Sequence, residues 1–158
     1  MNNYLSSSQL RSQLLQAGAL IDETQPLSFY QVPRQHGDES NRHFLTKLMI
    51  FKTARDLEYY PFLEVPVHEG ITDLLILPGP LYVQVEYCQS EIQLKSRQEK
   101  YYSLFSCKNY NAELIVVNYK EFPKKDQEID HWHRILAPYL GLSKMSWYSW
   151  KKSQEGSA

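Results

Sequence analysis

Two acidic residues in strand-like segments are the side chains of this sequence best suited to chemistry. Asp73 lies near the start of the apolar segment 71–77, and Glu86 lies near the end of the next such segment, 81–88. A hairpin brings the start of one strand beside the end of the next, so we expect the carboxylates about 5 Å apart. Two such carboxylates can hold a hard cation such as Mg²⁺ through oxygen ligands. The cation would polarise a phosphate and lower the pKa of a bound water.

Each carboxylate also has an ordinary interpretation, Asp73 as a turn residue and Glu86 as a solvated strand residue. Glu86, however, interrupts an apolar strand just before the start of a predicted helix. A carboxylate that enters a covered sheet needs a partner, and a metal ion is a good one. Taken together, the two residues favour a metal site.

A second set of polar residues has the spacing of one helix face. Glu39, His43 and Lys47 are four residues apart, so they lie on the same side of a helix. If this face borders the metal site, Glu39 adds a ligand, and His43 orients a water or contacts a phosphate. The other interpretation of His43 is a hydrogen-bonded histidine near a helix N-terminus. Glu64, in the first extended segment, is a weaker candidate ligand.

The pattern of apolar residues predicts the elements that must position these side chains. A first helix is expected over 5–20, followed by an irregular connection with a short strand near Phe29. The rest of the predicted elements are a helix over 40–59, strands over 62–68, 71–77 and 81–88, a helix over 90–108, a strand over 114–117 and a helix over 126–140. Ser90 and Gln93 have the spacing of a capping box, which marks the start of a helix.

This order predicts an α/β fold with a mixed four-stranded sheet flanked by helices. Tight turns at Gly70 and at 78–80 join the first three strands as a meander. The fourth strand follows a helix, so a right-handed crossover returns it parallel to its neighbour. We expect an N-terminal helix and connection over 1–37, a core domain over 38–142, and an aromatic and basic tail over 143–158.

Four short motifs occur in order along the predicted core. Residues 39–47 read ESNRHFLTK, residues 73–75 read DLL, residues 86–90 read EYCQS, and residues 97–101 read RQEKY. In this order and at these spacings, they resemble the motifs of the PD-(D/E)XK, restriction-endonuclease-like nucleases. Within that superfamily, they are most similar to the competence protein CoiA-like nucleases. The resemblance covers about residues 38–120.

The resemblance implies an αβββαβ core and the activity of a metal-dependent DNA endonuclease. Such an enzyme hydrolyses phosphodiester bonds through a Mg²⁺-activated water, with Mn²⁺ as a possible substitute. The implied metal ligands are Asp73, Glu86 and Glu39. The candidate catalytic residues are Asp73, Glu86, His43, Gln89 and Lys95. The candidate DNA contacts come from the helix motifs and a basic cluster: Lys47, Arg97, Gln98, Tyr101, Lys124 and Lys125.

The sequence departs from the superfamily pattern at one position. The lysine expected two residues after Glu86 is replaced by Cys88. A Gln commonly fills this position in the CoiA-like group, and Gln89 would reach it through a local bulge. Lys95, in the following helix, is the other candidate, although it also has the spacing of a surface pair with Glu91. This departure leaves open a second hypothesis, a catalytically inactive nuclease-fold subunit for DNA binding or assembly.

Composition limits the partners that the protein can have. The formal net charge is −1, so any DNA-binding surface must be local. No segment approaches the roughly 20 apolar residues of a membrane span, and no signal peptide or disulfide framework is visible. We therefore expect a cytoplasmic protein with DNA as its partner. A homodimer or higher homo-oligomer is expected because cutting both strands generally takes two sites. RNA processing on the same fold is a more distant hypothesis.

Overall fold

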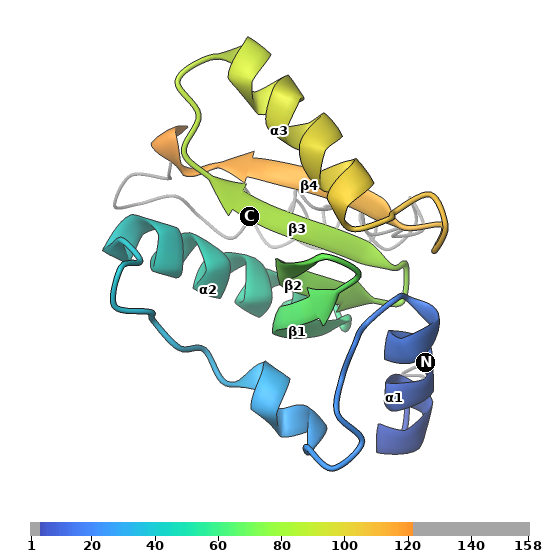
Figure 1. The fold of residues 1–158 in the computed structure, drawn as a ribbon. Coiled ribbons are helices and arrows are strands. Elements are labelled where there is room, and N and C mark those ends of the chain that lie inside the picture. Colours follow the sequence, from blue (N-terminus) through green and yellow to red (C-terminus); the bar gives the residue numbers. More distant parts are fainter. Residues whose placement is uncertain (1–3, 122–158) are drawn as a thin grey trace, which may run out of the picture.

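The computed structural model describes residues 4–121, and Figure 1 shows their arrangement. The elements follow in this order: α1 (Ser7–Gln16), the 3₁₀ helix η1 (Leu27–Gln31), α2 (Asn41–Asp56), β1 (Tyr60–Val67), β2 (Gly70–Leu77), β3 (Leu81–Glu86), α3 (Glu91–Leu104), β4 (Glu113–Asn118) and the 3₁₀ helix η2 (Tyr119–Glu121). The predicted helix 126–140 and the tail 143–158 lie outside the described residues. Within residues 4–121, no helix is long and apolar enough to span a membrane.

The strands form one four-stranded mixed sheet in the order β1-β2-β3-β4. The first three strands are an antiparallel meander, and β4 pairs with β3 in parallel. The crossover between β3 and β4 is α3. The predicted α/β fold with a mixed, helix-flanked sheet is therefore confirmed.

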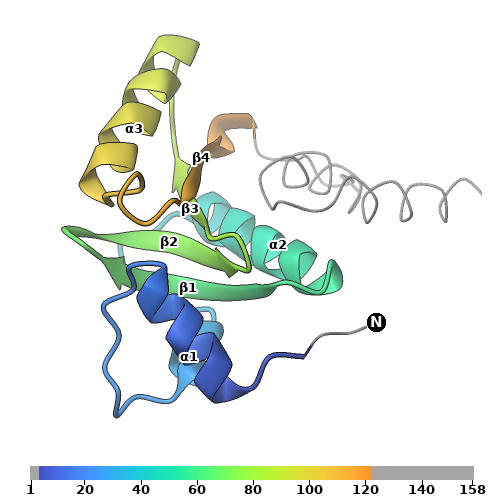
Figure 2. The ribbon, with the colours of Figure 1, turned by 90° about the vertical axis from the view of Figure 1, so that its right-hand side faces the viewer.

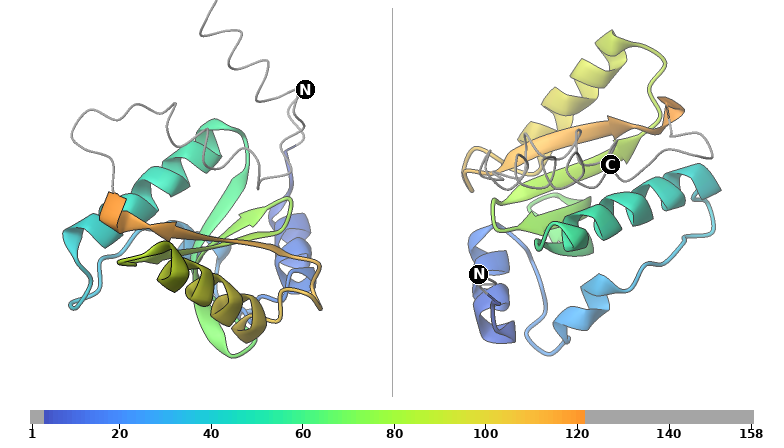
Figure 3. Two further views of the ribbon diagram at one scale, coloured as in Figure 1. Left: turned by 90° about the horizontal axis from the view of Figure 1, so that it is seen from above. Right: turned by 180° about the vertical axis from the view of Figure 1, so that it is seen from behind.

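Helices cover both faces of the sheet. Figure 2 shows α2 on one face, with α1 and α3 on the other. The α2 face is closed by apolar residues of the helix, Ile50, Phe51 and Ala54, which pack on strand residues that include Leu74 and Val85. The view from behind in Figure 3 shows α2 running across this face. In this arrangement the first turns of α2 lie beside the end of β3, where His43 is hydrogen-bonded to Val85.

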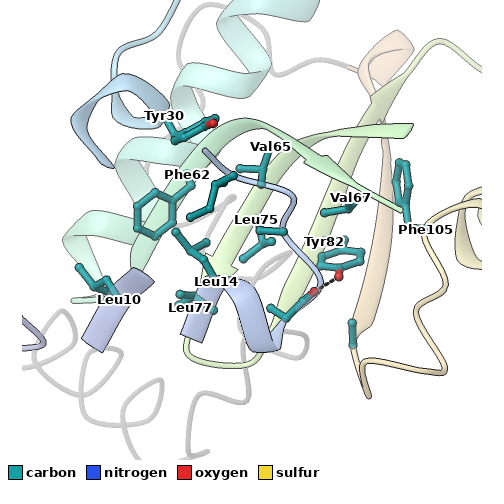
Figure 4. Packing of buried hydrophobic residues seen from close by; sticks show 14 of the residues in the cluster. Leu10, Leu14, Tyr30, Phe62, Val65, Val67, Leu75, Leu77, Tyr82 and Phe105 are labelled. Carbon is teal, nitrogen blue, oxygen red and sulfur yellow. Dashed lines mark hydrogen bonds between the residues drawn. The ribbon is translucent and has the colours of Figure 1, made fainter. Parts of the chain in front are cut away.

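The opposite face holds the larger apolar cluster, shown in Figure 4. Leu14 of α1 packs there with Phe62, Leu75, Tyr82 and Phe105, all of them buried. The hydroxyl group of Tyr82 donates a hydrogen bond to the carbonyl oxygen of Ala17 at the end of α1. This bond satisfies the polar end of a ring that would be costly to bury unpaired.

Two local differences from the sequence-based prediction concern the N-terminal segment. α1 ends at Gln16 rather than near residue 20, because Gly18 adopts a φ of 92°. A side chain at Gly18 would also meet the ring of Tyr110 at 2.8 Å. The expected strand near Phe29 is wrong: Phe29 lies in η1, where its N–H donates to the carbonyl oxygen of Pro26.

A change of alternation in β1 brings a carboxylate to the α2 face. Phe62 belongs to the apolar cluster under α1, and Leu63 belongs to the cluster under α2. Strict alternation would turn Glu64 towards the α1 face, but Glu64 adopts a φ of 52° and its carboxylate reaches Lys47 of α2. Val65 then faces the α1 cluster. A positive φ at a non-glycine residue is uncommon and marks a position where the fold redirects a side chain.

Candidate functional site

A pocket of about 490 Å³ lies between the start of α2 and residues of β1 and β2. Its carboxylate-bearing lining residues are Asp38, Glu39, Glu64 and Asp73. Its basic lining residues are His36, His43 and Lys47. The structure therefore brings together the predicted helix face of Glu39, His43 and Lys47 with the predicted strand residue Asp73.

Lys47 is the buried centre of this group. The residue is only 2% exposed, and its Nζ lies 2.7 Å from Glu39 Oε2 and 2.8 Å from Glu64 Oε1. Burial lowers the pKa of Lys47, but the hydrogen bonds and charges of the two glutamates outweigh burial and hold the pKa above its ordinary value. His36 extends the chain of charges, with its Nε2 2.6 Å from Glu64 Oε2.

His43 connects the helix to the strands. Its Nδ1 is hydrogen-bonded to Glu39 Oε2, and its Nε2 donates to the carbonyl oxygen of Val85 at 2.8 Å. The same Nε2 lies 3.7 Å from Asp73 Oδ2. Burial lowers the pKa of His43, but the hydrogen bonds and charges of Asp73 and Glu39 outweigh burial, so the pKa is raised. Two nitrogens facing acceptors suit the doubly protonated imidazolium.

One carboxylate oxygen of Glu39 is hydrogen-bonded and the other is not. Oε2 accepts from both His43 and Lys47, whereas Oε1 is buried and has no hydrogen-bond partner. Burial raises the pKa of Glu39, but the bonds and charges of Lys47 and His43 outweigh it and lower the pKa. Glu39 is therefore a carboxylate with a spare acceptor in a side chain only 6% exposed. A buried polar atom without a partner is unusual and marks a candidate ligand position.

Asp73 lies where the backbone pairing of the meander is interrupted. β1 and β2 pair at Leu63↔Leu74 and Val65↔Thr72, so Glu64 and Asp73 are level with each other between these pairs. On the other side, Val85 N–H donates to Asp73 Oδ2 at 2.7 Å. At Asp73, a side-chain hydrogen bond thus replaces part of the backbone hydrogen bonding between the strands.

Gln84 is the residue that the register of β2 and β3 places beside Asp73. The pair Leu74↔Val83 continues to Asp73 and Gln84, and Gln84 Oε1 accepts a hydrogen bond from the Asp73 N–H at 2.6 Å. Glu86 lies two residues further along β3. The structure therefore differs from the expected pairing of Asp73 with Glu86 across one strand spacing, because the register is offset by two residues.

The side chain of Glu86 is hydrogen-bonded to α3 instead of α2. Tyr101 of α3 donates a hydrogen bond from its hydroxyl group to Glu86 Oε1. Burial, together with the bond to Glu86 and its charge, raises the pKa of Tyr101 to about 12. Asp73 contacts α2 through His43, so the two predicted metal ligands have partners on different helices. Among residues 4–121, no group of three or more His, Cys, Asp and Glu residues is arranged to hold a metal ion.

The residues proposed for the lysine position lie in the connection between β3 and α3 and within α3. Cys88 is buried, and its N–H and carbonyl oxygen are both hydrogen-bonded to the side-chain amide of Asn118. Burial first, and then the charge of Glu86, raises the pKa of the Cys88 thiol. Gln89 is exposed and its N–H donates to Gln93 Oε1. Lys95 is an exposed residue of α3 and does not line the pocket.

The residues predicted to contact DNA differ in their exposure and in their partners. Lys47 is buried between two carboxylates. Gln98 joins α3 to β4, because its Nε2 donates to Leu114 O at 2.6 Å and its Oε1 accepts from Val116 N–H at 3.1 Å. Arg97 is half-buried on α3. Tyr101 is bonded to Glu86, and Lys124 and Lys125 lie outside the described residues.

Gln84, His36 and Tyr119 are among the site residues that the sequence analysis missed. Gln84 gave a signal, since it is a polar residue inside the apolar segment 81–85. His36 and Tyr119 gave none, because they enter the pocket from a loop and from the residue after β4.

Comparison with known proteins identifies no relative of this chain. No protein-family model, curated protein or solved structure matches the chain.

Proposed function

We propose that this protein is a metal-dependent DNA endonuclease, with Asp73 and the Glu39–His43 pair at the catalytic pocket. The observation that carries the proposal is the meeting of these three residues, which come from β2 and the start of α2, in one pocket. They meet on a sheet with the helix, meander, helix and parallel-strand order that the sequence resemblance implied.

The carboxylates of the pocket support a hard cation as its ligand. Four carboxylates line it against one lysine and two histidines, and Glu39 Oε1 is a buried oxygen without a partner. Mg²⁺ is usually held by one or two carboxylates, with water and substrate phosphate completing its coordination. Asp73 and Glu39 would hold the ion, because Glu86 is bonded to Tyr101 and does not line the pocket. When bound, the ion would polarise the phosphate and provide a more acidic water.

The remaining residues have roles in positioning and charge. His43 places a cationic ring 3.7 Å from Asp73 Oδ2 and beside Glu39, where it can attract a phosphate oxygen. Gln84 holds the backbone of Asp73. Lys47 fixes the orientation of Glu39 instead of facing the substrate. A homodimer would supply the second site that cutting both strands generally requires.

The test is Mg²⁺-dependent nicking of plasmid DNA by the purified protein. Asp73→Ala is expected to abolish nicking because it removes the strand carboxylate of the pocket. Asp56→Ala is the matched control, since Asp56 is an exposed carboxylate at the far end of α2, where it pairs with Lys52. Asp56→Ala should leave nicking unchanged. Nicking that persists in Asp73→Ala would overturn the proposal.

A second candidate function is that of an inactive nuclease-fold subunit that binds DNA or assembles with partners. It is favoured by the pairing of Lys47 with two glutamates and by the buried Cys88 in the lysine position. Calorimetry distinguishes the two functions. Mg²⁺ or Mn²⁺ binding that is lost in Asp73→Ala supports the nuclease, and the absence of such binding, with DNA binding retained, supports the inactive subunit.

A further inference from the structure

Two tyrosine rings extend from the pocket to the protein surface. Tyr119 lines the pocket, and its ring meets the His43 ring edge-on, with the centroids 5.5 Å apart. On its other side, the Tyr119 ring contacts the Tyr87 ring, again with 5.5 Å between centroids. Tyr87 is 45% exposed. A continuous line of rings therefore leads from the half-buried His43 to solvent.

The strand ends hold these two rings in place. Tyr87 and Tyr119 each follow the last residue of a strand, and these last residues, Glu86 and Asn118, are paired across β3 and β4. Parallel strands end at the same edge of the sheet, so the residues after them are neighbours. The Asn118 side chain then bonds both backbone groups of Cys88, at 2.9 Å and 2.8 Å. The connection that carries Tyr87 is thus tied to the end of β4.

Basic residues lie beside the rings, on the outer side of the pocket. Arg42 is exposed at the start of α2, and its Nη2 donates to the carbonyl oxygen of Lys120 at 3.2 Å. Lys120 is exposed and follows Tyr119 directly, and its Nζ lies 3.5 Å from the carbonyl oxygen of Gln89. The pocket itself is lined by four carboxylates, one lysine and two histidines, and neither Arg42 nor Lys120 is among its lining residues. Two exposed basic side chains therefore accompany the rings outside the pocket.

We propose that Tyr87 and Tyr119, flanked by Arg42 and Lys120, form a stacking platform for an unpaired base of single-stranded DNA that enters the pocket. This inference rests on the proposed function and names its substrate class. Aromatic rings and neighbouring cations together bind single strands, because every unpaired base has a face that can stack and every nucleotide has a phosphate. A base inside a duplex is already stacked on both faces and must be taken out before a ring can contact it.

The experiment compares the binding of a labelled single-stranded oligonucleotide and of its duplex by fluorescence anisotropy. Binding is measured in EDTA and again with Ca²⁺, with recovery of the intact oligonucleotide as a check. We expect tighter binding of the single strand. Tyr87→Ala should weaken single-strand binding about 5- to 150-fold, the range expected for the loss of one base–aromatic stack. Tyr87→Phe should retain binding because it keeps the ring.

Tyr102→Ala is the matched control. Tyr102 is 43% exposed, close to the value for Tyr87, and lies near the end of α3 that is distant from the β3–α3 connection. This variant should bind the single strand as the unaltered protein does. Equal binding by Tyr87→Ala and the unaltered protein in both buffers, or a preference for the duplex, would overturn the inference.

Binding and cleavage separate this inference from the proposed function. Single-strand binding that depends on Tyr87, without Mg²⁺-dependent nicking, would support the platform and contradict the nuclease. Nicking that depends on Asp73, with binding indifferent to Tyr87→Ala, would support the nuclease and contradict the platform.

Discussion

The two faces of the sheet are covered by helices, but they differ in what they bury. The α1–α3 face is closed by large apolar side chains, with Leu14, Phe62 and Phe105 fully buried. The α2 face has an apolar part under the second half of the helix and a charged part under its first turns. There Lys47 is buried between carboxylates. One sheet can thus combine a core that stabilises the fold with a polar end suited to binding.

The difference also shows in how each face satisfies its polar groups. On the α1 side, Tyr82 has one buried hydrogen bond to a backbone carbonyl oxygen. On the α2 side, the chain of contacts passes through His36, Glu64, Lys47, Glu39 and His43, and ends at Asp73. A linked polar network is stable only if its members keep their partners. The α2 face should therefore be the more sensitive to loss of a single charge.

The largest effect is expected for Lys47→Met. The change leaves two carboxylates facing each other in a buried site, and the loss of one partner of a buried ion pair costs about 3–5 kcal/mol. Urea unfolding measures the free energy of unfolding. Lys52→Met is the control, because Lys52 forms an exposed pair with Asp56, and such pairs contribute about 0–1 kcal/mol. Equal losses in the two variants would contradict the comparison.

A change on the apolar face should cost stability without affecting the pocket. Leu14→Ala removes a fully buried side chain of α1, and Leu→Ala changes in cores cost about 2–5 kcal/mol. The same urea measurement applies. Oligonucleotide and metal binding by the folded variant should equal those of the unaltered protein, since Leu14 belongs to the cluster on the α1 face and is not a lining residue of the pocket. Altered metal affinity would show that the two faces are coupled.

A smaller effect is expected for Gln84→Met. The change removes the acceptor of the Asp73 N–H, and a buried donor left without its partner costs about 1–3 kcal/mol. We also expect weaker metal binding by calorimetry, because Asp73 loses a positioning contact. Gln16→Met, at an exposed position of α1, is the control. Unchanged metal affinity in Gln84→Met would argue against a positioning role.

The smallest effect is a pH dependence of stability from His43. Its folded pKa is raised above the ordinary value of 6.5, so its contribution is complete below pH 6.5 and is lost as the pH rises through the folded pKa. The loss is about 1.4 kcal/mol for each unit of difference between the two pKa values. Urea unfolding from pH 6 to pH 9 should show a fall that is reduced in His43→Gln. Identical pH profiles would contradict the contribution of His43.

Much of the fold followed from local patterns of the sequence. The apolar periodicity predicted the order of helices and strands, and the turn at Gly70 and the crossover through α3 predicted the strand directions. These features depend on neighbouring residues. The position of Glu64 could not be predicted in this way, because its turn towards Lys47 depends on a φ of 52° within a strand.

The sequence by itself determined which side chains are present and which of them share a helix or a strand. Glu39, His43 and Lys47 lie on one face of α2 because their spacing follows the helical period. Only the tertiary structure decided their partners. Strand register placed Gln84 beside Asp73 and turned Glu86 towards Tyr101. The physical reason is that register depends on the packing of both faces at once, and an offset of two residues leaves every apolar residue on its correct face.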